Sequence, residues 1–105
     1  MSKLVVYSHN LVPIRLTDER WYHIITWHPE LDGQQEAVLE TVAGPELIQQ
    51  GDFGELLAVR FYRGTLFGDK YLMVAYREAN DTDGFILTAY YTRRLSTQRE
   101  TLWKR

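Results

Sequence analysis

The stretch "LLAVRFYRGTLFGDKYLMVAYREANDTDGFILTAYYTRR", residues 56–94, decides the fold that the sequence predicts. Three runs within it, 56–63, 70–77 and 85–94, are rich in aromatic and aliphatic residues, and turn-forming residues separate them. The second separator includes Asp83 and Gly84, a pair that favours a tight hairpin turn. These features predict an antiparallel meander of three strands.

The two faces of this predicted sheet differ in polarity, because side chains alternate between faces along a strand. One face is expected to pack against helices and to carry Leu57, Val59, Phe61, Leu72, Val74, Phe85, Leu87 and Ala89. The other face is expected to be open and to carry Arg60, Tyr62, Tyr71, Met73, Arg77, Thr88, Tyr90, Thr92 and Arg94.

Two helices are predicted before the meander. Thr17 offers an N-cap hydroxyl, and Asp18 and Glu19 place negative charge in the first turn, so a helix should begin at about residue 18. A second helix is expected over residues 34–43 and should stop at Gly44. The buried stripe of the first helix should consist of Trp21, Ile24, Ile25 and His28.

The remaining segments complete a single domain over residues 1–105. Short strand pieces are expected within residues 1–16, a connector over 46–55, and either a last helical turn or a frayed tail over 96–105. The predicted fold class is therefore α+β, with two N-terminal helices packed on one face of a small, three- to four-stranded antiparallel sheet.

Composition excludes several kinds of site. The chain has no cysteine, so disulfides, thiolate zinc sites and a cysteine nucleophile are ruled out. No apolar run approaches the roughly 20 residues of a membrane span, and the start lacks the apolar core of a signal peptide. We therefore expect a cytoplasmic protein without membrane contacts.

Charge is distributed unevenly along the chain. Through Glu55 there are three basic and nine acidic residues, a net charge of −6, whereas from Leu56 onward nine basic and five acidic residues give +4. The second half could present a positive surface to a phosphate backbone. The alternative is a solvated strand edge and tail. The overall net charge of −2 argues against a generally basic nucleic-acid binder.

Two of the three histidines lie in the first predicted helix or at its end. His23 and His28 are five residues apart, so they do not form the i, i+4 pair of a helical zinc site. Pro29 disfavours a helical conformation for His28, which should lie at or just past the helix C-terminus. There the imidazole either donates a proton or binds phosphate, or it simply caps carbonyl groups.

The open face suits an anion better than a metal ion, because it combines arginine, tyrosine and threonine without carboxylates. Cations, stacking rings and a titrating acid–base pair are the components of RNA cleavage without a metal. The competing interpretation is that tyrosine and threonine are simply good strand formers. No nucleotide-binding, serine-hydrolase or zinc-protease motif is present.

The pattern "IRLTDERWYHIITWHPEL … VLETVAGPELIQQG … LLAVRFYRG … KYLMVAYRE … DGFILTAYYTRR" resembles the small prokaryotic and phage nuclease-like domains grouped with barnase, EndoU, colicin D and RelE toxins. The resemblance covers nearly the whole chain after residue 13. It implies a metal-independent ribonuclease fold with helices on one sheet face and RNA on the other. Trp27 departs from the pattern, which commonly has a basic residue before the "HP" histidine.

Carried over to this chain, the resemblance implies a set of catalytic residues. Together with the predicted open face, it also implies a set of residues that bind phosphate. The catalytic set is His23, His28, Arg60, Thr88 and Tyr90. The set expected to bind RNA phosphates is Tyr62, Thr92, Arg93 and Arg94.

The expected function is therefore that of a metal-independent endoribonuclease of the toxin type, with no metal or other cofactor. Its expected partners are RNA and a cognate antitoxin or immunity protein. One alternative is a non-catalytic protein-binding or regulatory module on the same fold, which the slightly acidic net charge favours. Another is a homodimer or larger assembly that uses the aromatic face as an interface.

Overall fold

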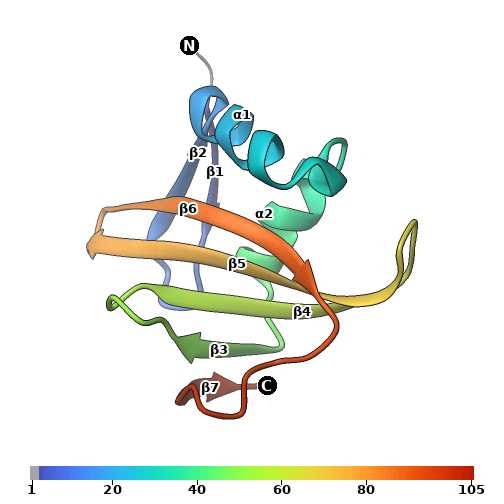
Figure 1. Cartoon of the computed structure of the whole chain (residues 1–105). Coiled ribbons are helices and arrows are strands. Elements are labelled where there is room, and N and C mark those ends of the chain that lie inside the picture. Colours follow the sequence, from blue (N-terminus) through green and yellow to red (C-terminus); the bar gives the residue numbers. More distant parts are fainter. Residues whose placement is uncertain (1–2) are drawn as a thin grey trace.

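The computed structural model describes residues 3–105, and the first two residues of the expected N-terminal strand pieces lie outside this range. Its elements form one sheet with helices against it (Figure 1). In chain order they are β1 (Lys3–Tyr7), β2 (Pro13–Thr17), α1 (Asp18–Trp27), the short 3-10 helix η1 (Pro29–Leu31), α2 (Gln35–Ala43), β3 (Leu47–Gln50), β4 (Leu56–Thr65), β5 (Gly68–Asn80), β6 (Asp83–Thr92) and β7 (Thr101–Lys104).

The sheet is larger than predicted and it is mixed. Its seven strands have the order β1-β2-β6-β5-β4-β3-β7, and β2 runs parallel to β6 while the other neighbouring strands are antiparallel. The prediction of a small, three- to four-stranded antiparallel sheet is wrong. The central β4–β5–β6 meander is present as predicted.

Two strands account for part of the error. Residues 47–50 form β3, although they were expected in a connector, and residues 101–104 form β7, where a helical turn or a frayed tail was expected. Both are four-residue strands, and β7 pairs with β3 only through long-range contacts. Short segments with polar residues carry little local strand signal, so tertiary pairing decides their conformation.

Both helices form close to the predicted positions. The side chain of Thr17 caps α1 by accepting a hydrogen bond from the backbone N–H of Arg20 at 3.1 Å. Ile24 is buried, and Trp21 and Ile25 pack against the same core. Helix α2 ends at Gly44, whose N–H donates to the carbonyl of Glu40.

The sheet is apolar on both faces at its centre. The helix side contains the main core, in which Ala58, Leu72 and Val74 meet residues of α1 and α2. A second, smaller cluster on the opposite face contains Leu57, Val59, Met73 and Ala75. Because β4 is apolar at successive positions, the sequence does not show which of its side chains face the helices.

The predicted side-chain orientation is therefore wrong for most of β4 and for part of β6. Leu57, Val59 and Leu87 belong to the face away from the helices, while Leu56, Ala58 and Ile86 contribute to the helix side. Leu72, Val74 and Ala89 lie on the helix side as predicted. A register irregularity between Ala75 and Tyr76 shifts the alternation within β6.

The sheet curls so that its ends approach one another. The β1–β2 hairpin crosses behind the meander in Figure 1, and α2 contacts β1 as well as β4 and β5. The ring of His9, in the β1–β2 turn, lies 4.1 Å from that of Trp103 in β7, centroid to centroid. Ser8 and Asn10 donate hydrogen bonds to the Glu78 carboxylate at the end of β5. His9, which carries no sequence signal, thus helps to join the two sheet edges.

Gly84 is part of β6 rather than the predicted hairpin turn, since the β5–β6 connection lies between Asn80 and Asp83. A Cβ at Gly84 would lie 2.5 Å from the Cδ1 atom of Ile14 and 2.6 Å from the carbonyl oxygen of Arg77. Glycine is needed here because β2 and β5 both approach the backbone of β6 closely.

Candidate functional site

The first part of the candidate site is the line of contact between α1 and β6. Strand β2 pairs with β6 only at Gly84 and Phe85, and beyond that point α1 lies beside β6 (Figure 1). The Arg20 guanidinium donates to the carbonyl oxygen of Leu87 at 3.5 Å, and the His28 ring lies 5.8 Å from the Tyr90 ring, centroid to centroid. We call the region of Arg20, His23, Trp27, His28, Thr88 and Tyr90 the α1/β6 seam.

His28 is the C-cap residue of α1, as predicted from the proline that follows it. Its backbone N–H donates to the carbonyl of Ile24 at 2.8 Å, and its side chain is 33% exposed. Within residues 3–105 its ring makes no hydrogen bond to a carbonyl, so the ring is not used for capping. The Nδ1 atom lies 3.8 Å from Glu30 Oε2, which places a carboxylate beside the imidazole.

His23 has different neighbours. It is exposed and lines a hollow of about 240 Å³ together with Thr17, Glu19 and Arg20. On an α-helix, two residues five positions apart point roughly 140° away from each other. His23 and His28 therefore do not form one adjacent acid–base pair.

Arg60 is held on the helix side of the sheet. Its guanidinium lies 3.0 Å from the Glu40 carboxylate and donates to the carbonyl of Gly44 at 3.0 Å. In the register, Arg60 is opposite Leu72 of the main core, whereas Thr88 is opposite Ala75 of the other cluster. Arg60 and Thr88 thus lie on opposite faces, and the structure does not bring Arg60 to the predicted constellation.

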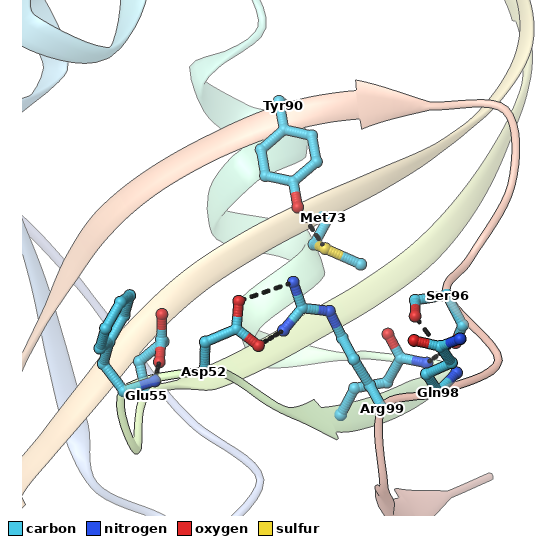
Figure 2. A network of polar contacts seen from close by, with 9 residues as sticks. Asp52, Glu55, Met73, Tyr90, Ser96, Gln98 and Arg99 are labelled. Carbon is cyan, nitrogen blue, oxygen red and sulfur yellow. Dashed lines mark hydrogen bonds and ion pairs between the residues drawn. The ribbon is translucent and has the colours of Figure 1, made fainter.

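The other predicted residues of β6 do face away from α2. Figure 2 shows the Tyr90 hydroxyl pointing to the sulfur of Met73, to which it donates at 2.9 Å. Thr92 is opposite Tyr71 on this face, and its hydroxyl donates to the carbonyl of Arg94 at 2.9 Å. Thr88, Tyr90 and Thr92 form one row, as the sequence predicted.

The same face carries a further polar network (Figure 2). Arg99, in the segment before β7, binds the Asp52 carboxylate at 3.0 Å. These two residues line a hollow of about 460 Å³ between β3 and the β6–β7 connection. Because the arginine is already paired, this hollow has no cation available for an anionic ligand.

Tyr62 was expected beside Thr92 but packs against the helices instead. Its hydroxyl donates to the carbonyl of Ala37 at 3.2 Å and lies 3.3 Å from the Thr41 hydroxyl. Burial raises the pKa of Tyr62, although the Thr41 hydrogen bond opposes the shift. The expectation that Tyr62 lies on the open face is wrong, for the same reason as for Arg60.

The second part of the candidate site is a group of cations at the end of the sheet. Six of the twelve basic side chains make an ion pair or hydrogen bond with described residues: Arg15, Arg20, Arg60, Arg77, Arg99 and Arg105. The six without such a partner among residues 3–105 are Lys3, Arg63, Lys70, Arg93, Arg94 and Lys104.

Four of these six belong to one region. Arg63 and Lys70 flank the β4–β5 hairpin, and Arg93 and Arg94 follow β6 just beyond the register pair of Thr92 with Tyr71. Figure 1 shows the hairpin projecting near the point where β6 ends. We call Arg63, Lys70, Arg93 and Arg94 the cationic end. The cationic end contains four of the nine basic residues that follow Leu56.

Two neighbouring hollows lie beside the cationic end, and Glu30, which lies 3.8 Å from His28 of the seam, lines both. One of about 280 Å³ lies between η1 and the β4–β5 hairpin and is lined by Glu30, Arg63, Phe67 and Tyr91. The other, of about 340 Å³, shares Glu30, Phe67 and Tyr91 and adds Lys70. Burial raises the pKa of Tyr91, and the nearby Tyr62 and Glu30 raise it further, so its hydroxyl stays protonated at neutral pH.

Sequence reasoning missed several of these residues. Arg20 shares a helical stripe with His23, a spacing that could have marked it. Arg63 and Lys70 flank the hairpin sequence "GTLFGD", which places two cations beside exposed aromatic and apolar side chains. The position of Glu30 next to His28 carried no sequence signal, because η1 had not been predicted.

Residues 3–105 contain neither a metal-binding group of side chains nor a membrane-spanning helix. Among them, no group of three or more histidine, aspartate or glutamate side chains is arranged to hold a metal ion. None of the helices in this range is long and apolar enough to cross a membrane. Comparison of the chain with family models, curated proteins and solved structures found no match.

Proposed function

We propose that the chain is a metal-independent endoribonuclease whose reactive groups lie at the α1/β6 seam. The proposal depends chiefly on His28, a partly exposed imidazole whose ring lies 5.8 Å from that of Tyr90 and 3.8 Å from the Glu30 carboxylate. An imidazole and a carboxylate that can reach the same phosphate supply a proton donor and a proton acceptor near neutral pH. The resemblance to small nuclease domains supports the same chemistry.

The proposed reaction is transfer of the phosphate to the neighbouring 2′-oxygen. Glu30 accepts the proton of the 2′-hydroxyl, the 2′-oxygen forms a bond to phosphorus, and the bond to the 5′-oxygen breaks. His28 gives its proton to that leaving oxygen. The products are a 2′,3′-cyclic phosphate and a free 5′-hydroxyl. Glu30 and His28 carry out both proton transfers in this scheme without a metal.

The remaining residues of the seam position the phosphate. Arg20 provides the cation in this scheme in place of Arg60, which is committed to Glu40 and Gly44. Thr88 offers a hydroxyl group from β6, whereas Tyr90, whose hydroxyl donates to Met73, positions the His28 ring. Arg93 and Arg94 attract the anionic chain at the end of β6, because they have no partner among residues 3–105.

A second candidate is a non-catalytic module that binds another protein. Its specific support is the edge strand β1, where Leu4, Val5 and Tyr7 are 45%, 46% and 61% exposed. An exposed apolar edge strand can accept a strand from a partner. In the toxin interpretation, the partner would be a cognate antitoxin or immunity protein.

The test is cleavage of diverse RNAs in EDTA by the wild type, His28→Ala and His23→Ala. The wild type should produce cyclic phosphate ends, and His28→Ala should cut roughly 10²–10⁴-fold more slowly. His23→Ala should have the smaller effect, because His23 does not contact Tyr90 or Glu30. Thermal unfolding of each variant controls for loss of folding. A wild type that leaves every RNA intact would refute the nuclease and favour the binding module.

A further inference from the structure

The hollows between η1 and the β4–β5 hairpin have a composition that the proposed reaction does not explain. Cleavage needs groups around one phosphate, but Arg63, Phe67 and Lys70 lie on the hairpin, away from α1. Lys70 is only partly exposed although no described residue pairs with it. An ammonium group with no carboxylate partner is available to an anionic ligand.

The apolar residues of the same region are also unusually exposed. Leu66 is 91% and Phe67 is 56% exposed, and both line the smaller hollow together with Tyr91. Two aromatic rings beside two cations are the elements that hold one nucleotide of a single strand. The rings stack on the base and the cations bind the phosphate.

The position of the hollows links them to the reactive groups. Glu30 lines both hollows and lies 3.8 Å from the His28 ring. A strand whose scissile phosphate lies at His28 can therefore continue past Glu30 toward the hairpin. Arg93 and Arg94 directly follow β6, whose Tyr91 lines both hollows.

We propose that the hollows between η1 and the β4–β5 hairpin form a second nucleotide subsite, which binds the unit next to the scissile phosphate in single-stranded RNA. Arg63 and Lys70 bind its phosphate, and Phe67 and Tyr91 stack on its base. Glu30 separates this subsite from the reactive phosphate. The proposal rests on the proposed function for the identity of the ligand, but it concerns binding and not cleavage.

The test uses a fluorescein-labelled decamer of 2′-O-methyl RNA, which cannot be cleaved because it lacks the 2′-hydroxyl. Binding to the full chain is measured by fluorescence anisotropy as a function of salt. The double variant Arg63→Ala/Lys70→Ala should raise Kd by roughly tenfold or more and reduce the salt slope by about 0.7, the value for one phosphate, because both side chains bind the same phosphate. The matched control is Lys3→Ala/Lys104→Ala, which removes two unpaired cations outside the hollows and should change Kd much less.

A second pair of variants tests whether the Phe67 ring stacks on a base. Phe67→Ala should weaken binding roughly 5- to 100-fold, the range expected for one lost base–aromatic contact. The matched control, Phe53→Ala, removes an aromatic ring that is 83% exposed and lines neither hollow, and it should have little effect. Both residues are exposed, so neither substitution should alter thermal unfolding.

The outcomes separate the subsite from the nuclease. If both double variants weaken binding equally and Phe67→Ala binds like the wild type, the subsite is refuted, even where RNA is still cleaved through His28. If the wild type cuts no RNA but binds the decamer through Arg63, Lys70 and Phe67, the subsite stands and the nuclease fails. Equal affinity for a poly-glutamate peptide, independent of Phe67, would refute the nucleotide subsite in favour of an acidic protein partner.

Discussion

The ring of His28, at the C-terminus of α1, lies 5.8 Å from the ring of Tyr90 in β6. This contact joins the end of a helix to the part of a strand that has no strand neighbour on that side. The contact with Tyr90 holds the His28 ring in place. The ring nitrogens remain available, because the backbone N–H of His28, and not its ring, bonds to the last turn of α1.

His28→Phe separates the packing role of this histidine from its chemical role. Phenylalanine retains a ring against Tyr90 but cannot transfer a proton. We expect a melting temperature close to that of the wild type and a cleavage rate lower by roughly 10²–10⁴-fold. The measurements are thermal unfolding by circular dichroism and cleavage of a labelled RNA in EDTA. A variant that folds and still cuts at the wild-type rate would exclude His28 from the reaction.

Arg60 and Arg20 should have opposite effects on stability and on cleavage. Arg60→Ala removes a partly exposed ion pair with Glu40 and a hydrogen bond to Gly44, so we expect a loss of about 1–2 kcal/mol in unfolding free energy. Its cleavage rate should be unchanged. Arg20→Ala should slow cleavage with less effect on stability. Urea unfolding and RNA cleavage distinguish the effects of the two substitutions. If Arg60→Ala is as stable as the wild type but cleaves RNA slowly, Arg60 takes part in the reaction.

Gly84→Ala should destabilise the fold by roughly 1–3 kcal/mol, because the added methyl group overpacks a tight site. The new Cβ would lie 2.5 Å from Ile14 Cδ1 and 2.6 Å from the Arg77 carbonyl. Adding Ile14→Val removes only the first of these contacts, so the double variant should be more stable than the sum of the single effects. Urea unfolding of the four proteins in this cycle measures the coupling. Strict additivity would show that Ile14 is not in contact.

Stability should fall in alkaline solution. Burial raises the pKa values of Tyr62, Tyr76 and Tyr91 above the ordinary value of 10.0. The folded chain therefore binds phenolic protons more tightly than the unfolded chain. The stabilisation is complete below about pH 10 and is lost as the pH rises through the higher folded-state values. The midpoint of urea unfolding, measured from pH 8 to pH 11, should decrease accordingly.

Tyr76→Phe should make this alkaline decrease less steep. The Tyr76 hydroxyl is buried and has no hydrogen-bond partner among residues 3–105. Removing it should leave the unfolding free energy at pH 7 unchanged or raise it by about 1 kcal/mol. A large loss of stability in Tyr76→Phe at pH 7 would show that the hydroxyl has a partner after all.

Local sequence signals determined the helices and the central meander. Thr17, Pro29 and Gly44 predicted the boundaries of α1 and α2, because capping and the restriction before proline act within a few residues. The alternating runs between residues 56 and 94 predicted β4, β5 and β6, since two-residue periodicity is a property of each strand by itself. The row of Thr88, Tyr90 and Thr92 followed from the same periodicity.

Only the tertiary structure decided the extent of the sheet and the membership of the site. Strands β3 and β7 form through long-range pairing, and β2 joins β6 at only two positions. The sequence did not reveal that Arg60 and Thr88 lie on opposite faces of the sheet. Because β4 is apolar on both sides, its orientation depends on what packs against each face. The contacts of His28 with Tyr90 and Glu30 arise where α1 ends beside β6, and residues so far apart in sequence are brought together by packing rather than by local preference.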